Sequence, residues 1–536
     1  MNPMQPRRET EGLRDGRLAL AISAVMLVVC AWPLALTEFP PYQDLPNHLA
    51  SAAIVQRLDQ YPEFVFNGLL KTNSALLAWL LIVGKVTGLS LAARLFALIV
   101  LGANALVLPR FVLVLTGSRE RMIIASALMW PMIHNWFVST GMLNFALAVP
   151  LALAVLMAIY RQRRAPNWTN GLAVTGLGVL TWYAHVFPLL VVHLLVGVEA
   201  MFCPSSKGRV ADVRTMATPL LPVTALVGLS LLSQMGDTVG PMTGFADYRK
   251  LLPVWELAYN MWAEYLWGFS KLTITSLVPC LLLAGLGASK LKESPPFFSP
   301  IALAVMLGLY CLLPYTATNW FHLNSRLIPF LWAALALRVP RTLPRPVLTL
   351  LGISAALYSA GMGGDFVRLE RERQEFTAGI PSVPEGARLL PLLFRQTGSS
   401  DNTRSLLHYW GYYVIEKHTT APLLFAHSNS FPVMYRHPPP PRFNHLPLEG
   451  FARSSASSAD VCKRIFEGNV TVNDCDAAFH IAWRSFWSDA IPTFDYLLIW
   501  DATQEARALI PPVYQPIFER GRLAIYARVS DSPAPR

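Results

Sequence analysis

Long apolar runs, most of them free of charge, alternate along the chain with short segments that are rich in Lys and Arg. The first run, residues 18–36, carries no charge and is long enough for a helix to cross the ~30 Å hydrocarbon core of a bilayer. The rest of the pattern supplies ten more spans, so the sequence predicts an α-helical polytopic membrane protein with about eleven transmembrane helices. The later spans are 91–116, two within 122–160, two within 165–198, 215–234, 272–289, 297–316, 323–337 and 346–364.

A short apolar segment, residues 72–84, decides the topology. This segment is too short to cross a bilayer as a helix, so we expect it to be interfacial or re-entrant. The basic clusters between paired spans then fall on the cytoplasmic side, as the positive-inside rule requires. If the segment crossed, the later clusters would lie outside. The expected organisation is a cytoplasmic tail (1–17), a transmembrane domain (18–364) with a first outer loop (37–90), and an outer C-terminal domain (365–536).

The outer C-terminal domain, residues 365–536, is large enough for its own core. Its pattern alternates strand-like and helix-like runs, which predicts an α/β domain. The predicted elements are strands at 388–394, 422–426 and 496–500 and a helix at 406–418. Cys462 and Cys475 lie close together in the sequence of this domain, and we expect them to form a disulfide if the domain is periplasmic.

Composition agrees with a membrane location. Only 14% of the residues are charged and the mean hydropathy is +0.39, whereas ordinary soluble domains have about 25% charged residues. The net charge is +11, and the Lys and Arg residues mostly flank the spans, where they set orientation and meet anionic lipid. We therefore expect membrane lipids as partners, and no nucleic acid.

One acid, Asp44, follows the first span on the predicted outer side, in the segment Pro40-Pro41-Tyr42-Gln43-Asp44. The sequence leaves two interpretations open. Asp44 precedes Leu45-Pro46 and so suits the N-cap of a helix. It also suits a general base, which needs its carboxylate exposed to a reacting group.

Other polar residues reach the predicted outer face from separate segments, and ionisable groups at membrane depth usually face a cavity or a partner. Arg326, near the outer start of a span, is either an interfacial anchor or a clamp for a phosphate group. The remaining candidates are Glu38, His48, Lys85, His134, Asn144, His185, Arg249, Lys250, His322 and Asn324.

With these features the sequence resembles the GT-C superfamily of polyprenyl-phosphate-dependent membrane glycosyltransferases, to which lipid-A aminoarabinose transferases and protein O-mannosyltransferases belong. The resemblance rests on eleven spans, an acid-bearing first outer loop, an interfacial segment before the second span and an outer C-terminal domain. Two local motifs add to it: Gly141-Met142-Leu143-Asn144-Phe145 and Asn324-Ser325-Arg326-Leu327-Ile328-Pro329. The family's loop commonly carries two neighbouring acids, whereas here only Glu38 accompanies Asp44, which leaves a divalent metal open; the sequence has no metal-ligand pattern.

The resemblance implies an inverting glycosyltransferase. A sugar would move from a polyprenyl-phosphate donor to a glycan, lipid or protein acceptor at the outer face of a bacterial inner membrane. Asp44 would be the general base, with Glu38 next in line and His48 on the same helix face. Arg326 would hold the donor phosphate, helped by Arg249, Lys250 and Lys85. The substrate cavity would be lined by Tyr42, His134, Asn144, His185, His322 and Asn324.

Three other classes stay open. A lipid-linked polysaccharide polymerase or ligase would rely on Arg and His of the outer loops instead of an acid in the first loop. A transporter or flippase would place ionisable groups near the bilayer midplane, where these spans have almost none. A non-catalytic assembly protein would tolerate the loss of Asp44.

Overall fold

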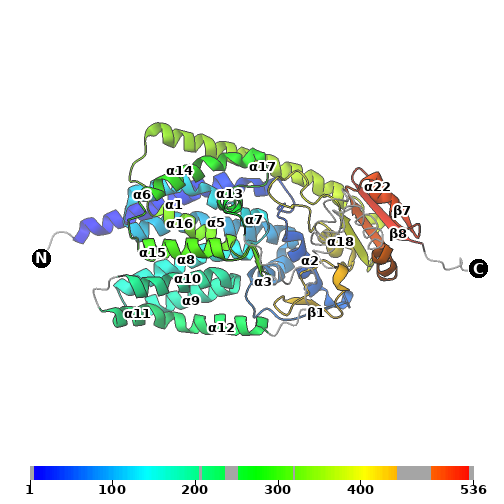
Figure 1. The fold of residues 1–536 in the computed structure, drawn as a ribbon, viewed down its shortest axis with the longest axis horizontal. Coiled ribbons are helices and arrows are strands. Elements are labelled where there is room, and N and C mark those ends of the chain that lie inside the picture. Colours follow the sequence, from blue (N-terminus) through cyan, green and yellow to red (C-terminus); the bar gives the residue numbers. More distant parts are fainter. Residues whose placement is uncertain (1–4, 204–207, 236–251, 318–319, 444–483, 530–536) are drawn as a thin grey trace, which may run out of the picture.

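The computed structural model describes residues 5–203, 208–235, 252–317, 320–443 and 484–529. A bundle of long helices fills one half of the molecule, and a smaller unit with a β-sheet fills the other (Figure 1). Seven helical segments within the described residues are long and apolar enough to cross a membrane: Gly16–Ala35, Leu89–Thr116, Arg119–Ser139, Leu143–Arg164, Arg209–Leu232, Lys271–Ala288 and Arg345–Ser382. Val186–Phe202, Pro300–Leu312 and Ser325–Ala336 are shorter apolar helices.

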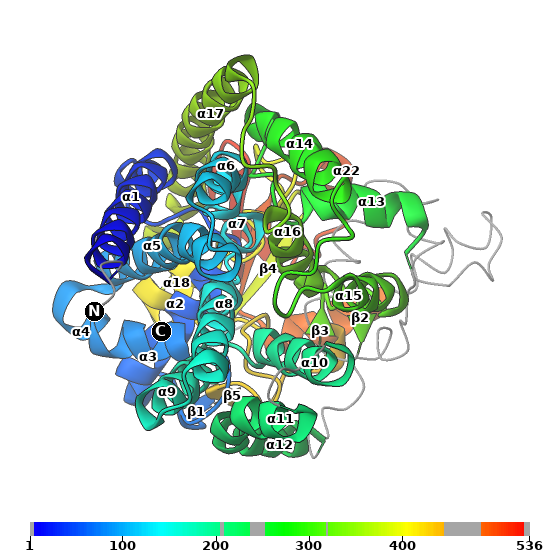
Figure 2. The ribbon, with the colours of Figure 1, turned by 90° about the vertical axis from the view of Figure 1, so that its left-hand side faces the viewer.

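All eleven predicted spans coincide with helices, which confirms a mostly helical, polytopic architecture. The helices of the bundle are α1 (Gln5–Ala31), α5 (Leu89–Thr116), α6 (Arg119–Met129), α7 (Trp136–Ser139), α8 (Leu143–Arg164), α9 (Trp168–Ala184), α10 (Val186–Phe202), α11 (Arg209–Ala217), α12 (Leu221–Met235), α14 (Leu277–Ala288), α15 (Pro300–Leu312), α16 (Ile328–Ala336) and α17 (Arg345–Thr377). Viewed along the bundle, α8 lies near the middle, between α5 and α10 (Figure 2).

The first outer loop carries short elements of its own: α2 (Leu45–Gln56), β1 (Phe64–Phe66), α3 (Ala75–Ile82) and α4 (Gly84–Thr87). The apolar segment 72–84 becomes α3, which has eight residues. At 1.5 Å per residue this helix is about 12 Å long, too short to cross a bilayer. A further short helix, α13 (Val254–Ala263), precedes the helices that end in α17.

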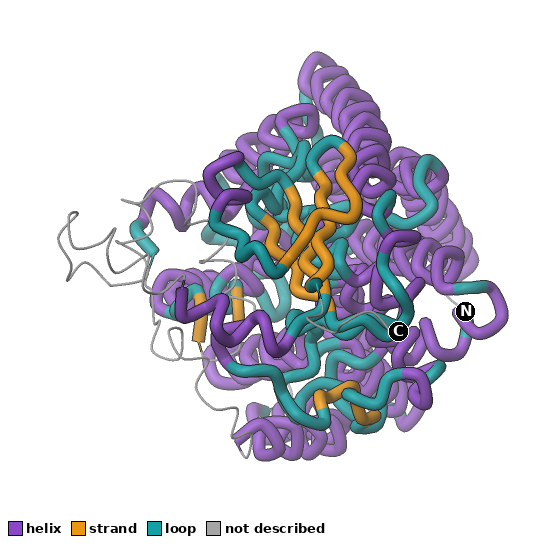
Figure 3. The backbone as a smooth tube through the Cα atoms, turned by 90° about the vertical axis from the view of Figure 1, so that its right-hand side faces the viewer, coloured by secondary structure: helices purple, strands orange, loops and turns teal. Residues whose placement is uncertain are grey.

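The C-terminal unit is built around a four-stranded sheet with the order β4-β6-β8-β7. Its strands are β4 (Leu389–Leu393), β6 (Tyr496–Trp500), β7 (Tyr514–Arg520) and β8 (Leu523–Arg528). β4 and β6 are parallel and the other pairs are antiparallel. Helices lie behind the sheet when it is viewed from this end of the molecule (Figure 3). The remaining elements are α18 (Gly411–Lys417), β5 (Val433–Tyr435) and α22 (Gln504–Ala508).

Two details of this unit differ from the sequence prediction. Residues 422–426 form turns instead of a strand, because their backbone groups bind side chains: the N–H of Phe425 donates to Oδ1 of Asn47, and the N–H of Leu424 donates to Oη of Tyr435. The predicted helix at 406–418 starts only at Gly411, after a run of turns.

α17 joins the two halves without a break. It has 33 residues, about 50 Å of helix, and continues past residue 364 into the C-terminal unit (Figure 1). There Arg522, from the sheet, forms ion pairs with Glu372 at 3.1 Å and with Glu375 at 2.8 Å. These contacts attach the sheet to the end of the long helix.

The first outer loop and the C-terminal unit also interlock. β1 pairs with β5 in an antiparallel arrangement, and Oη of Tyr61 donates to the carbonyl oxygen of Val414 at 2.7 Å. α18 packs so closely on α2 that a Cβ at Gly411 would lie 2.6 Å from the carbonyl oxygen of Pro46. The loop that carries Asp44 is therefore covered by residues from the far end of the chain.

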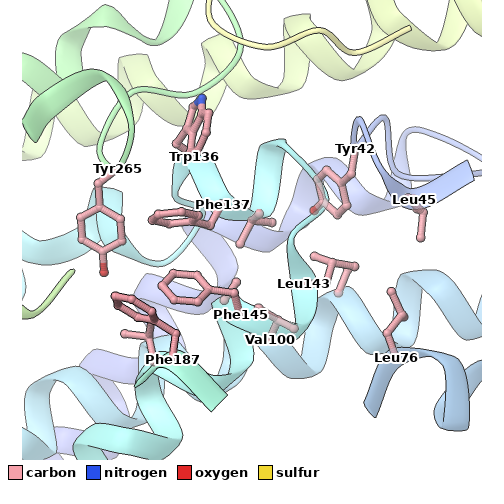
Figure 4. Close-up of a cluster of buried hydrophobic side chains, with 14 of the residues drawn as sticks. Tyr42, Leu45, Leu76, Val100, Trp136, Phe137, Leu143, Phe145, Phe187 and Tyr265 are labelled. Atoms are coloured by element: carbon pink, nitrogen blue, oxygen red, sulfur yellow. The ribbon is translucent and has the colours of Figure 1, made fainter. Parts of the chain in front are cut away.

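Aromatic and aliphatic side chains fill the space between the first outer loop and the bundle (Figure 4). Tyr42 and Leu45 of the loop are fully buried, and the rings of Phe137 and Phe145 pack together with their centroids 4.5 Å apart. This core supports the loop from the side of the bundle.

Candidate functional site

A short turn between α7 and α8 holds Asp44 in place. The N–H of Asp44 donates to the carbonyl oxygen of Thr140 at 3.0 Å, and the N–H of Gln43 donates to that of Ser139 at 3.2 Å. Gly141 follows with a φ of +80°, and a Cβ there would lie 2.6 Å from the Asp44 nitrogen. Glycine permits both this conformation and this close approach. The turn at residues 139–141 thus fixes the position of the acid.

The carboxylate of Asp44 is held through one of its oxygens. Oδ1 accepts a hydrogen bond from Nε2 of Gln43 at 3.1 Å and lies 3.4 Å from Nε2 of His408. Among the described residues, Oδ2 has no hydrogen-bond partner. Asp44 stands at the N-cap position of α2, yet its side chain makes no capping hydrogen bond. The capping interpretation is therefore wrong for the side chain, which is directed at Gln43 and His408.

The surroundings of Asp44 favour its ionised form. Burial alone would raise the pKa of this carboxyl, but the interactions with His408, His48 and the amide of Gln43 outweigh it and hold the pKa below its usual range. Burial lowers the pKa of His48, and the nearby Asp44 carboxylate opposes that shift in part. Asp44 is thus a carboxylate at neutral pH, as a proton acceptor must be.

Arg326 lies inside the protein, in the turn that opens α16. It is 8% exposed, and its Nη1 lies 2.9 Å from Nε2 of His185 while Nη2 donates to the carbonyl oxygen of Phe321 at 3.3 Å. The guanidinium also covers the face of Phe145, 5.1 Å from the ring centroid. An interfacial anchor would expose its charged end to water or headgroups, so this geometry does not fit that interpretation.

Asp44 and Arg326 are electrostatically coupled, although they come from opposite ends of the transmembrane region in sequence. A carboxylate of the first outer loop and a buried cation at the start of α16 thus lie within electrostatic range of each other. The guanidinium is a group of fixed positive charge, suited to binding a phosphate or carboxylate.

Other predicted residues have different surroundings. Glu38 forms an ion pair with Arg373 at 2.7 Å, and its side chain is 58% exposed, so it lies on the outside of the loop. Lys85 is exposed on α4, and the ring of His48 contacts Phe425 with centroids 5.9 Å apart. Arg249, Lys250, Cys462 and Cys475 lie outside the described residues, so the helper and disulfide predictions stay predictions.

Tyr42, in the acid-bearing loop, and His134 are both buried, with their rings edge to face at 5.6 Å. Asn144 binds backbone instead: Oδ1 accepts from the N–H of Leu76 at 2.8 Å, and Nδ2 donates to the carbonyl oxygen of Asn73 at 2.9 Å. Asn144 therefore holds the start of α3 against α8.

His322 and Asn324 belong to a polar cluster around an acid that sequence analysis did not single out, Glu264. Tyr315 donates to Oε1 of Glu264 at 2.8 Å, and Nδ1 of His322 lies 3.6 Å from the same oxygen. The hydroxyl of Ser325 also donates to Glu264. Hydrogen bonds to His322, Ser325 and Tyr315 outweigh the effect of burial and hold the pKa of Glu264 below its usual range.

A segment of the C-terminal unit that the sequence did not point to, residues 400–408, also reaches the bundle. Nδ2 of Asn402 donates to the carbonyl oxygen of Ala263 at 2.8 Å, and the N–H of Arg404 donates to Oε1 of Gln43 at 3.0 Å. His408 completes the contact with Asp44. Its only signal in the sequence is polarity next to aromatic residues, and nothing local links it to a loop near the other end of the chain.

Among the residues that the structure describes, no group of three or more His, Cys, Asp or Glu side chains is arranged to hold a metal ion. The described part of the chain thus offers no ligand set for the divalent metal that the sequence left open.

Comparison with solved structures identifies the fold. A crystal structure of ArnT from Cupriavidus metallidurans bound to undecaprenyl phosphate matches with a TM-score of 0.50 at 10% sequence identity, and the structure of the same protein in the apo state matches with a TM-score of 0.51 at 12%. Each match covers 96% of this chain and 99% of the ArnT chain. A cryo-EM structure of the arabinofuranosyltransferase AftD from mycobacteria matches with a TM-score of 0.50 at 13% identity, over 97% of this chain and 40% of the larger protein. No protein-family model matches the chain, and no curated protein matches it by sequence. The structural likeness shows that this chain shares the fold of ArnT and AftD, as the resemblance to the GT-C superfamily led us to expect.

Proposed function

We propose that this protein is a membrane glycosyltransferase that moves a sugar from a polyprenyl-phosphate donor to an acceptor hydroxyl. The observation that carries the proposal is the ionisation and hydrogen bonding of the Asp44 carboxylate. Its carboxylate is ionised, Oδ1 is held by Gln43 and His408, Oδ2 has no partner among the described residues, and the buried Arg326 is within electrostatic reach.

In the proposed reaction, Oδ2 of Asp44 takes the proton of the acceptor hydroxyl as its oxygen attacks the anomeric carbon of the sugar. The bond between that carbon and the phosphate oxygen breaks, and its electron pair leaves with the polyprenyl phosphate. Attack opposite the leaving group inverts the anomeric configuration. Arg326 stabilises the negative charge that develops on the phosphate. Stabilisation of developing charge by a group already held in position is usually the largest contribution to lowering a reaction barrier.

The likeness to ArnT bound to undecaprenyl phosphate supports a polyprenyl-phosphate donor. A lipid carrier also suits a site that lies between an outer loop and a helical bundle. We place the reaction at the outer face of a bacterial inner membrane, with the N-terminal tail (1–17) in the cytoplasm and the C-terminal domain (365–536) in the periplasm. The acceptor is a glycan, a lipid or a protein.

The test separates binding from chemistry in purified protein. Undecaprenyl phosphate binding is measured by native mass spectrometry, and transfer is measured with undecaprenyl-phosphate-linked pentoses and hexoses, together with envelope extract as the source of acceptor. The proposal expects wild type and Asp44→Asn to bind the lipid equally while only wild type transfers sugar. Transfer by Asp44→Asn at the wild-type rate would show that the base is another residue and would favour a polymerase or ligase that relies on Arg and His.

A further inference from the structure

The surroundings of His408 determine where its imidazole carries its proton. One of its neighbours, Asn47, is fully buried on α2, about one turn after Asp44. Oδ1 of Asn47 accepts a hydrogen bond from the N–H of Phe425 at 3.1 Å. A backbone N–H can only donate, so this contact fixes the orientation of the amide and identifies its other end as the donor, Nδ2.

Nδ2 of Asn47 has two neighbours. It donates to the carbonyl oxygen of Leu423 at 3.1 Å and lies 3.3 Å from Nδ1 of His408. Because Nδ2 is a donor, Nδ1 of His408 must be the acceptor and carries no hydrogen. A neutral imidazole with a bare Nδ1 has its hydrogen on Nε2. That nitrogen is the one that lies 3.4 Å from Oδ1 of Asp44.

Gln43 is oriented by the same kind of contact. Its Oε1 accepts from the N–H of Arg404 at 3.0 Å, so its Nε2 is the end that faces Asp44, and this nitrogen donates to Oδ1 at 3.1 Å. Two donors therefore converge on one oxygen of the carboxylate. Backbone N–H groups of the C-terminal unit orient both donors. The N–H of Arg404 orients Gln43 directly, and the N–H of Phe425 orients His408 by way of Asn47.

Packing keeps His408 in this position. Its side chain is 1% exposed, and its ring lies edge to face against Phe425, with centroids 5.0 Å apart, and against Trp410 at 5.9 Å. A buried and packed ring cannot turn to exchange its two nitrogens without opening the contact between α2 and the C-terminal unit.

We propose that His408 is a positioning residue of the site: its neutral imidazole donates the Nε2 hydrogen to Oδ1 of Asp44 and so keeps Oδ2 directed at the acceptor hydroxyl. The role in catalysis rests on the proposed function, but the hydrogen bond itself does not. The imidazole keeps its hydrogen throughout, and the acceptor's proton goes to Oδ2 of Asp44. The other charged or titratable groups that act on this carboxylate are His48 and Arg326.

The first test follows protonation of Asp44 without any assay of sugar transfer. A hydrophobic carbodiimide modifies protonated carboxyl groups, so the pH at which Asp44 becomes half labelled, read by peptide mass spectrometry, reports its pKa. His408→Phe keeps the aromatic packing and removes the donor, and we expect the midpoint to rise by about one pH unit because hydrogen bonding to a charged form favours it. His408→Gln places an amide nitrogen near the Nε2 position and should restore a midpoint near that of wild type.

Two controls define the signal. Asp44→Asn must abolish labelling of that peptide. Labelling of the exposed Glu38 must be the same in wild type, His408→Phe and His408→Gln. A His408→Phe protein that melts like wild type and labels Asp44 at the wild-type midpoint overturns the proposal.

The second test reads the protonation of the His408 ring directly in the wild-type chain, so it does not depend on a pKa shift in a variant. Nitrogen NMR of protein with ¹⁵N-labelled histidine distinguishes the two neutral forms and the doubly protonated form of each ring. The chain has 11 histidines, and the resonances that disappear in His408→Gln belong to His408. We expect a hydrogen on Nε2 alone at pH 7; a hydrogen on Nδ1 overturns the proposal.

Activity then separates this inference from the proposed function. We expect His408→Phe to lower kcat about tenfold and to shift the acid limb of its pH profile upward, with the donor KM unchanged and both effects reversed in His408→Gln. If the labelling midpoint moves but no variant or wild type transfers sugar, the proposed function fails and the positioning stands. If transfer requires Asp44 but neither midpoint nor profile moves, the positioning fails and the function stands.

Discussion

Gly141 lies against Asp44 so closely that a single added carbon would meet it: a Cβ at residue 141 would be 2.6 Å from the Asp44 backbone nitrogen. This approach brings the acid-bearing loop to the turn between α7 and α8. It also makes the position of the acid sensitive to a residue that has no functional group.

The first prediction follows from this contact. Gly141→Ala should displace the loop and destabilise the protein by about 1–3 kcal/mol, the usual cost of strain at a positive φ, and should lower transfer at least tenfold. Gly176→Ala is the matched control, because a Cβ there meets nothing within 4 Å. Melting temperature and transfer rate are measured on both variants, and equal behaviour of the two would contradict the structure at this turn.

Replacing the acid tests the chemistry. Asp44→Asn keeps an oxygen that accepts from Gln43 and His408, and no capping hydrogen bond is lost, so melting should change little. Transfer should fall by ~10²–10⁴-fold, the contribution of a general base. Glu38→Gln is the control, because Glu38 pairs with Arg373 on the outside of the loop; an equal loss in both variants would mean that the loop's fold, not its base, was disturbed.

Replacing the buried cation should affect the donor. Arg326→Lys keeps the charge but loses the planar fork, and Arg326→Ala loses both, so affinity for undecaprenyl phosphate should fall in the order wild type, Lys, Ala. Native mass spectrometry with undecaprenyl phosphate measures this order. Arg371→Ala, which removes an exposed charge on α17, should leave the affinity unchanged, and a loss of the same size there would point to general attraction by positive charge.

The pKa of Asp44 sets a pH dependence. Because the folded protein holds this pKa below its usual range, the carboxylate remains ionised until the pH falls below about 3.9. Its contribution to stability is present above that pH and is lost as the pH falls through the lowered pKa. We therefore expect the acid limb of kcat that Asp44 sets to lie below about pH 3.9 in wild type. A limb near pH 6 that persists unchanged in His408→Phe would belong to another group.

Topology can be tested with matched serines that the structure shows as exposed. In a background without the six native cysteines, Ser488→Cys in the C-terminal unit should react with a membrane-impermeant reagent added to spheroplasts. Ser289→Cys, at the end of α14, should react only after the membrane is opened. Labelling of Ser289→Cys in intact spheroplasts would refute the eleven-span topology.

Periodicity and charge were sufficient for the helices, because an apolar run long enough to span a bilayer has few alternative structures. They were also sufficient for β4 and β6. They failed at residues 422–426, where the backbone binds side chains of Asn47 and Tyr435 instead of a neighbouring strand. Such contacts depend on a distant part of the chain and leave no local pattern.

The candidate site divides in the same way. Asp44 and Arg326 could be proposed from the sequence because each is a charged residue at the end of an apolar run. Gln43 and His408 could not, since an amide and a histidine have many ordinary roles and become informative only when their neighbours are known. Glu264 was missed because its partners, Tyr315 and Ser325, lie far beyond it in the sequence.

The position of His408 has a consequence for biogenesis. The loop with Asp44 leaves the ribosome well before His408, because 364 residues separate residue 44 from residue 408 (408 − 44). At about 5–20 residues per second, synthesis of the intervening chain takes roughly 20–70 s. During that interval the acid lies at the membrane surface without the contact that orients it. A nascent or truncated chain that ends before residue 408 therefore lacks this contact, and the site would be assembled only after that segment has been made and has packed on the loop.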